Sequence, residues 1–163
     1  MSNGLRAMVL CFLWYCASVG SYSVVFAQDI VIQPLAKMSR VLVVYYSRDG
    51  HTQQVAQALA KRFHADTERL IDMKKRTGPF GFPAAGKDAI AGNLTKLGPL
   101  AHDPGQYDVI LIGTPSWFGN VTPAVRTFVK EYDLSQKKIG VFGTAHMTGV
   151  ENALKELLSL IHI

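Results

Sequence analysis

Three short, mostly apolar runs stand out along the chain, at residues 41–46 (VLVVYY), 108–113 (DVILIG) and 138–143 (KIGVFG). Runs of this length that are rich in β-branched residues are typical of strands buried on both faces of a parallel sheet. Residues 67–72 form a weaker strand candidate. The pattern therefore predicts four strands.

Between these strands, apolar residues recur at helical spacing. The predicted inner faces consist of Val55, Ala56, Leu59, Ala60 and Phe63, then Val125, Phe128, Val129 and Tyr132, and last Val150, Leu154, Leu157 and Ile161. A further helix is predicted over about residues 84–97. Thr122 and Pro123 suit the start of a helix, and Thr148 with Glu151 forms a capping-box pattern. Strands that alternate with helices predict an α/β fold with right-handed βαβ units.

Composition narrows the class of protein. A chain of 163 residues, 48% apolar and 18% charged, fits one globular domain. The formal charge is +5, but the basic residues are scattered apart from Lys74-Lys75-Arg76, so we expect no nucleic-acid interface. Cys11 and Cys16 both lie near the N-terminus and form no disulfide framework or metal cluster. Any redox chemistry would therefore come from a bound cofactor.

The N-terminal segment has three interpretations. Residues 7–27 are uncharged, follow Arg6 and end in Val25-Phe26-Ala27, which resembles the cleavage site of a signal peptide for export through segment 1–27. The run is also long enough to be retained as a membrane anchor. Alternatively, translation starts at Met38, so that residues 1–37 are an extension and residues 38–163 form a cytoplasmic domain. We favour the third interpretation, because export of a protein that has already folded around its cofactor needs a twin-arginine signal, which the sequence lacks.

Polar loops follow the strong strands at residues 47–52, 114–121 and 144–149. Ligands of open α/β sheets bind outside these strand ends. The first loop leads directly into a helix N-terminus, whose amides and dipole favour an anion, and Ser47 and Thr52 add hydroxyl donors. These features predict a phosphate site. The alternative is an ordinary turn in which Ser47 or Asp49 caps the helix.

The loops and their flanking strands resemble the flavodoxin family. VLVVYYSRDGHTQQVAQAL is similar to the opening of that family, whose phosphate loop T/S-x-T-G-x-T is matched by Ser47, Gly50 and Thr52. DVILIGTPSWFGNVTPAVRTFV resembles the second flavin loop, and KIGVFGT followed by AHMTG resembles the third. The resemblance spans roughly residues 38–157 and implies a flavodoxin-like, doubly wound parallel sheet.

Only four strands are predicted, so a fifth strand and its helix are expected to be missing at the C-terminal end, which leaves a sheet edge exposed. Residues 158–163 (LSLIHI) either end the last helix or do not belong to the natural chain.

The resemblance further implies non-covalently bound FMN. It assigns the phosphate to Ser47, Arg48, Asp49, Gly50, His51 and Thr52, and the isoalloxazine ring to Thr114, Pro115, Ser116, Trp117, Phe118, Gly119 and Asn120 with Thr144, Ala145, His146 and Gly149. Trp117 is the expected stacking residue, whereas Phe118 is expected to pack inward or at a partner surface. Gly119 would allow a backbone rearrangement beside flavin N5.

Two positions depart from the family pattern. Asp49 replaces a threonine, and its carboxylate would compete with phosphate for the loop amides unless it turns aside. The Ala145-His146-Met147 loop lacks the tyrosine that often covers the other flavin face. His146 is then expected either to stabilise reduced flavin or donate a proton, or simply to face solvent.

The expected function is electron transfer through FMN with a redox partner protein. The alternative is an FMN-dependent NAD(P)H:quinone oxidoreductase, because the string TP-x-x-FGN is similar to quinone reductases related to tryptophan-repressor-binding protein. The basic charge favours a reductase over an acidic shuttle. A non-redox interaction domain is the second alternative. Lys74-Lys75-Arg76 is either a solvated loop or a site for an anionic partner or nicotinamide phosphates.

Overall fold

The computed structural model describes residues 23–27, 39–74, 76, 81–146 and 149–161. Within these ranges one sheet contains β1 (Ser23–Ala27), β2 (Val41–Tyr45), β3 (Asp66–Arg69), β4 (Val109–Pro115) and β5 (Lys138–Ala145), in the order β1-β5-β4-β2-β3. Strands β2 to β5 are mutually parallel, which confirms the predicted α/β fold.

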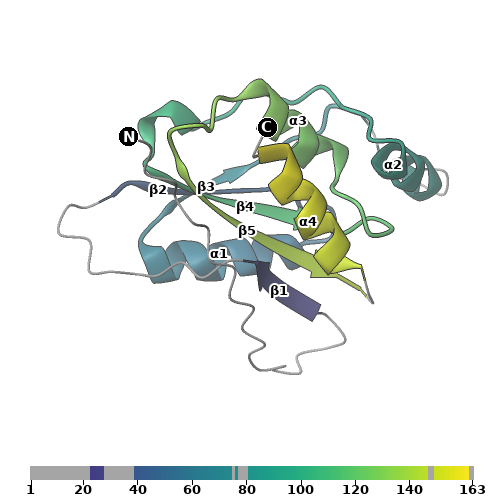
Figure 1. Cartoon of the computed structure of the whole chain (residues 1–163), viewed down its shortest axis with the longest axis horizontal. Coiled ribbons are helices and arrows are strands. Elements are labelled where there is room, and N and C mark those ends of the chain that lie inside the picture. Colours follow the sequence, from purple (N-terminus) through teal and green to yellow (C-terminus); the bar gives the residue numbers. More distant parts are fainter. Residues whose placement is uncertain (1–22, 28–38, 75, 77–80, 147–148, 162–163) are drawn as a thin grey trace, which may run out of the picture.

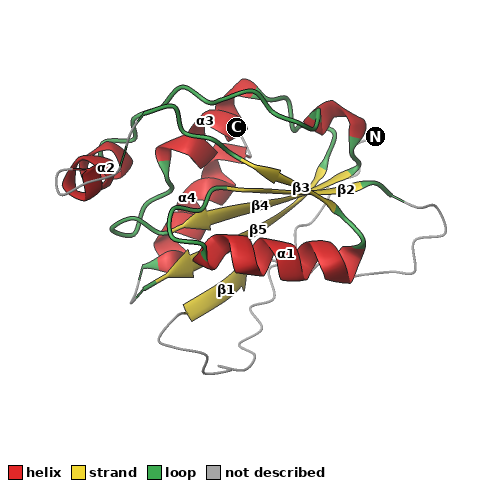
Figure 2. Ribbon diagram, turned by 180° about the vertical axis from the view of Figure 1, so that it is seen from behind, coloured by secondary structure: helices red, strands yellow, loops and turns green. Residues whose placement is uncertain are grey.

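Helices cover both faces of this sheet. Helix α1 (His51–Phe63) lies on one face, and α3 (Pro123–Glu131) and α4 (Val150–Ile161) lie on the other, as Figure 2 shows. The strands are apolar on both sides: Val43, Leu111 and Phe142 pack toward α1, whereas neighbouring strand residues such as Leu42 and Ile112 belong to the larger core with α3 and α4. Continuous apolar runs are what a strand buried on both faces requires.

The edge beyond β5 is occupied, contrary to expectation. Strand β1 pairs antiparallel with β5, from Ser23 opposite Ala145 to Ala27 opposite Val141 (Figure 1). The sequence suggested a signal or anchor at residues 7–27 and an open sheet edge. The end of that segment is rich in valine, which suits a strand, and unpaired backbone groups on the edge of β5 provide its partner. Residues 1–22, the rest of the predicted signal or anchor, lie outside the described part.

Helix α2 (Gly81–Ile90) is displaced from the predicted range of 84–97 and lies at the side of the molecule (Figure 1). The chain turns at Gly92, where φ is +69°. Residues 71–73 and 96–98 then pair in antiparallel fashion, with Met73 N donating to Lys96 O at 2.9 Å and Gly98 N to Ile71 O at 2.8 Å. The helix therefore ends at the Gly92 turn, and residues 96–98, which were predicted to be helical, belong to this pairing instead. A short 3₁₀ helix, η1 (Pro104–Gln106), precedes β4.

Two helix caps were predicted, one at Thr122 and one at Thr148. Thr122 does precede α3 with Pro123 at its first position, but the Thr122 hydroxyl forms no cap and instead lies 3.2 Å from the Thr114 hydroxyl. Thr148 of the predicted capping box lies outside the described residues. None of the helices in the described ranges is both long enough and apolar enough to cross a membrane.

Candidate functional site

The loops at 47–52, 114–121 and 144–149 meet at the carboxyl edge of the parallel strands. The hydroxyl of Thr52 lies 2.8 Å from that of Thr144, and both side chains are buried, so the first and third loops are joined. Ser116 joins the second loop to the third, through N donating to Thr144 O at 2.7 Å and Oγ donating to Gly149 O at 3.1 Å. The structure thus brings the predicted loops into one site.

The first loop presents a helix N-terminus without a side-chain cap. Gly50 is the N-cap residue of α1, with φ at +92°, and its N–H donates to Ser47 Oγ at 3.1 Å. Neither Ser47 nor Asp49 provides a side-chain cap for α1, and the Ser47 hydroxyl accepts from the N-cap residue itself. An uncapped first turn directed at a loop with hydroxyl groups is the arrangement that binds phosphate at helix N-termini.

Asp49 is turned away from the loop amides. Its carboxylate accepts hydrogen bonds from the Arg48 guanidinium, at 3.0 and 3.2 Å from Nε and 2.9 Å from Nη2. The hydrogen bonds from Arg48 lower the pKa of Asp49, and the positive charges of Arg48, His51 and His146 lower it further. The side chain that replaces the family threonine is therefore neutralised locally rather than aimed at the amides. His146, which is exposed, belongs to the electrostatic surroundings of this loop.

The second loop ends in a two-residue turn. Trp117 and Asn120 exchange backbone hydrogen bonds at 3.1 Å, while Phe118 and Gly119 adopt φ values of +53° and +79°, as in a type I′ turn. Glycine suits this conformation, but a phenylalanine rarely adopts it. Asn120 Nδ2 donates to Phe118 O at 2.8 Å and supports the turn. The Phe118 side chain is 62% exposed, and its ring also lies against Gly86 of α2.

Trp117 directly precedes the two turn residues and is only 7% exposed. Its ring meets Tyr46 edge to face, with ring centres 5.6 Å apart. The guanidinium carbons of Arg48 and Arg76 each lie 5.9 Å from its centre, within the range of a cation–π interaction. Of the two neighbouring aromatic residues in this loop, Trp117 is thus the enclosed one and Phe118 the exposed one.

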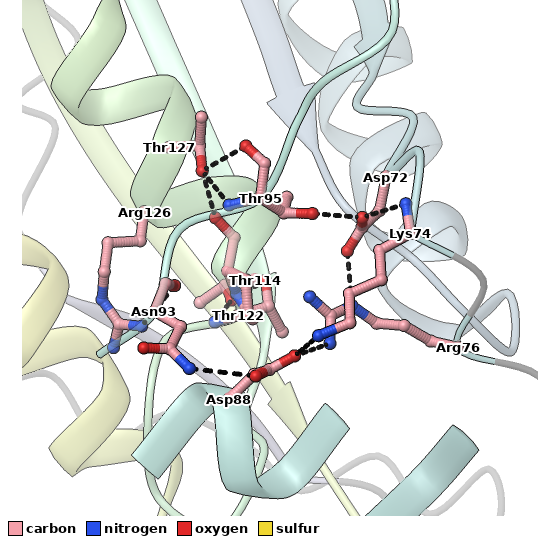
Figure 3. Close-up of polar contacts among 11 residues, drawn as sticks. Asp72, Lys74, Arg76, Asp88, Asn93, Thr95, Thr114, Thr122, Arg126 and Thr127 are labelled. Atoms are coloured by element: carbon pink, nitrogen blue, oxygen red, sulfur yellow. Dashed lines mark hydrogen bonds and ion pairs between the residues drawn. The ribbon is translucent and has the colours of Figure 1, made fainter. Parts of the chain in front are cut away.

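Asp72, Lys74, Arg76 and Asp88 form an ionic network with a buried centre at Arg76 (Figure 3). Arg76 also lies beside Trp117. Arg76 bonds Asp72 through Nε at 2.5 Å and Asp88 through Nη1 at 2.6 Å. Lys74 Nζ also bonds Asp88 at 2.6 Å. Lys74 and Arg76 of the predicted basic cluster are therefore ion-paired, with Arg76 buried and Lys74 half exposed, while Lys75 lies outside the described residues.

The network makes stability depend on acid pH. Hydrogen bonds from Lys74, Asn93 and Arg76 lower the pKa of Asp88 far below its usual range. A carboxylate whose pKa is lower in the folded state contributes stability at neutral pH, and that contribution is lost as the pH falls below its ordinary pKa of about 4. We expect this dependence in urea unfolding between pH 5 and pH 3. There the free energy of unfolding of the unaltered chain should fall by up to about 1.4 kcal/mol per pH unit more than that of Asp88→Asn. Glu131→Gln, at an exposed carboxylate at the end of α3, is the control and should keep the original slope; an equally steep slope in Asp88→Asn would contradict the assignment.

Sequence reasoning missed Tyr46, Asp72, Arg76 and Asp88 as neighbours of the second loop. The spacing of Asp72 and Arg76, four residues apart, is a weak signal for a local ion pair. Nothing in the sequence links either residue to Asp88 or to Trp117, because these contacts join segments that only the folded chain brings together.

Comparisons with known proteins agree with this architecture. Residues 87–161 match the family model described as flavodoxin. A NAD(P)H dehydrogenase (quinone) from Acidithiobacillus ferrooxidans is 36% identical over 94 residues, which are 56% of this chain and 46% of that protein. Its counterpart from Cupriavidus metallidurans is 35% identical over 96 residues, 58% of this chain and 47% of that protein. The chain therefore spans about half the length of these curated relatives.

Structural similarity extends over more of the chain. The crystal structure of a flavoprotein in complex with FMN from Lactobacillus acidophilus has a TM-score of 0.66 at 19% sequence identity, and the match covers 76% of this chain and 86% of that one. At this identity the similarity concerns the fold. The strand order and the structural match show a flavodoxin-like fold, and the similarity to the flavodoxin family model lies in residues 87–161.

Proposed function

We propose that this chain binds FMN non-covalently and transfers electrons through it. The observation that carries the proposal is the convergence of the three loops on the uncapped N-terminus of α1, with Asp49 turned onto Arg48. When bound, FMN would accept electrons from one partner and pass them to another. The protein's own part is to hold the phosphate, enclose the ring and control access to it.

The phosphate end of FMN fits the first loop. An added Cβ at Gly50 would meet no atom within 4 Å, so the loop has open space above the start of α1. Ser47 and Thr52 bring hydroxyl groups to the same turn, and the helix dipole favours the negative charge. Because Arg48 neutralises Asp49, the nearest carboxylate does not oppose a phosphate as a full, free charge.

For the ring, we retain Trp117 as the proposed contact of the isoalloxazine. Of the two cations near Trp117, Arg48 is the more exposed, with 28% of its side chain accessible against 3% for Arg76, so the flavin is proposed to approach the indole from the Arg48 side. The small residues Gly119 and Gly149 let the second and third loops approach closely, since a Cβ on Gly149 would lie 3.1 Å from Gly119 Cα. The two loops therefore pack backbone against backbone at this point, without a side chain between them.

Substitutions at the two aromatic residues test this assignment. Trp117→Leu should weaken FMN binding about 5- to 150-fold, because stacking on a planar base-like ring contributes about 1–3 kcal/mol. Phe118→Leu is the matched control and should change the dissociation constant less than about twofold. Both constants can be measured by quenching of flavin fluorescence, with melting curves to confirm folding. If Phe118→Leu causes the larger loss, the exposed ring rather than Trp117 contacts the flavin.

A second candidate function is FMN-dependent NAD(P)H:quinone oxidation and reduction. The relatives named NAD(P)H dehydrogenase (quinone) favour it, as does the net charge of +5, which differs from that expected for an acidic shuttle. On this proposal NAD(P)H delivers electrons to the flavin and a quinone removes them. On the first proposal, a partner protein supplies or accepts the electrons instead.

One experiment separates these functions. The full chain is purified, loaded with FMN, and titrated anaerobically with NADPH while the visible flavin absorbance is followed. Rapid bleaching that menadione reverses supports the oxidoreductase, whereas bleaching only after a reductase is added supports the carrier. A folded chain that takes up no FMN would exclude both and leave an interaction domain.

A further inference from the structure

Arg76 is a buried side chain that the proposed flavin contacts do not include. It is 3% exposed, and Asp72 and Asp88 hold its guanidinium from two sides (Figure 3). Each carboxylate is itself anchored: Asp72 accepts from Lys74 N at 2.9 Å and Thr95 Oγ1 at 2.6 Å, and Asp88 accepts from Lys74 Nζ and Asn93 Nδ2. The orientation of the guanidinium is therefore set by two carboxylates that are themselves hydrogen-bonded.

The third nitrogen of this guanidinium has a different environment. Nη2 is buried and finds no hydrogen-bond acceptor among the residues that the structure describes. A buried N–H without an acceptor normally costs stability. The guanidinium carbon nevertheless lies 5.9 Å from the centre of the Trp117 ring, where attraction to the π face offsets part of that cost.

The two cations near Trp117 differ in how firmly they are held. Arg48 pairs at the surface with Asp49, whose side chain is 58% exposed, and such pairs are weak and screened by salt. Arg76 is desolvated and doubly anchored, and cation–π attraction is stronger when water is excluded. Arg76 is thus the firmly held cation of the two.

We propose that Arg76 is a positioning residue for Trp117, fixing the orientation of the indole on which the flavin stacks. The part of this inference that concerns flavin rests on the proposed function. The part that concerns the indole does not, because it follows from contacts within the protein. A lysine at position 76 would keep the charge but lose the planar fork, so it could not bond both carboxylates and still face the ring.

The first test needs no FMN. The sequence has two tryptophans, so Trp14→Phe makes Trp117 the sole source of the tryptophan near-UV circular dichroism. In this background Arg76→Lys should lose at least about half of the Trp117 signal, because an indole that is free to reorient gives little. Glu68→Gln is the control: it alters another buried charged group, which accepts from Ala101 N and His102 N away from Trp117, and should leave the signal unchanged. An undiminished signal in folded Arg76→Lys would overturn the proposal.

If Arg76→Lys does not fold, Asp72→Asn takes its place. This variant keeps the guanidinium but weakens one of its anchors, and it must reduce the same signal. A folded Asp72→Asn protein with an unchanged signal would equally overturn the proposal.

The second test asks whether Arg76 acts on flavin through Trp117. Arg76→Lys should weaken FMN binding about tenfold when Trp117 is present and less than about twofold in a Trp117→Leu background, since contacting residues are coupled in a double-mutant cycle. Equal losses in both backgrounds would show that Arg76 acts by another route and would overturn the inference. A chain that binds no FMN but still loses its tryptophan signal in Arg76→Lys would reject the proposed function and keep the role of Arg76.

Discussion

Replacing Thr52 with valine should raise the dissociation constant for FMN about 10- to 150-fold while leaving the fold intact. Valine has nearly the shape of threonine but lacks the hydroxyl, so the substitution removes one proposed phosphate donor without opening a cavity. A hydrogen bond to a charged group contributes about 1.5–3 kcal/mol, which corresponds to this range. The constant can be measured by titrating apoprotein into FMN and following flavin fluorescence.

The same substitution should also loosen the junction of the first and third loops. Thr52 Oγ1 lies 2.8 Å from Thr144 Oγ1, and both are buried, so valine leaves the Thr144 hydroxyl without this partner. We expect a loss of about 1–3 kcal/mol in the free energy of unfolding. Thus Thr52→Val should affect both affinity and stability.

Thr127→Val provides a matched control. Thr127 is also buried, and its hydroxyl donates to Pro123 O and accepts from Thr95 N, but it lies on α3 outside the loops. Its replacement should cost similar stability and leave the affinity for FMN nearly unchanged. If both valine variants bind FMN like the unaltered chain, the Thr52 hydroxyl does not hold the phosphate.

Replacing Phe128 with alanine should cost about 3–5 kcal/mol of the free energy of unfolding. Phe128 is fully buried on the inner face of α3, and its ring stacks on Tyr132 with centres 5.0 Å apart. Alanine removes the apolar surface and leaves a cavity that the surrounding sheet and helices fill only in part. In a chain of this size, the melting temperature should fall by roughly 6–20 °C, at about 2–4 °C per kcal/mol.

Phe118→Ala is the comparison for this effect. The side chain removed is the same, but Phe118 is mostly exposed, so the change in stability should stay within about 0.5 kcal/mol. Urea unfolding of both variants gives the two free energies directly. Similar losses for the two would mean that Phe118 is buried in solution, or that Phe128 is not part of the core.

Much of the architecture could be predicted from the local pattern of apolar residues in the sequence. The strands at 41–46, 108–113 and 138–143 and the helices between them follow from apolar runs and helical spacing, and the structure confirms them within a few residues at their ends. The α2 range was wrong, because the chain leaves the helix at Gly92, where φ is +69°, and residues 96–98 pair with 71–73 instead of continuing the helix. Strand β1 was missed for the same kind of reason, since its partner lies on β5.

At the site, the sequence by itself determined the alternation of strands and helices, and with it the edge where the three loops meet, because parallel strands place their carboxyl ends together. It also determined which loops carry glycine and hydroxyl groups. Only the tertiary structure decided that Asp49 turns onto Arg48, that Trp117 is enclosed while Phe118 is exposed, and that Arg76 lies beside the indole. Periodicity reports which face of an element is apolar, whereas the partner of a buried charge or ring depends on segments far apart in the chain, and these meet only when the sheet and its helices have packed.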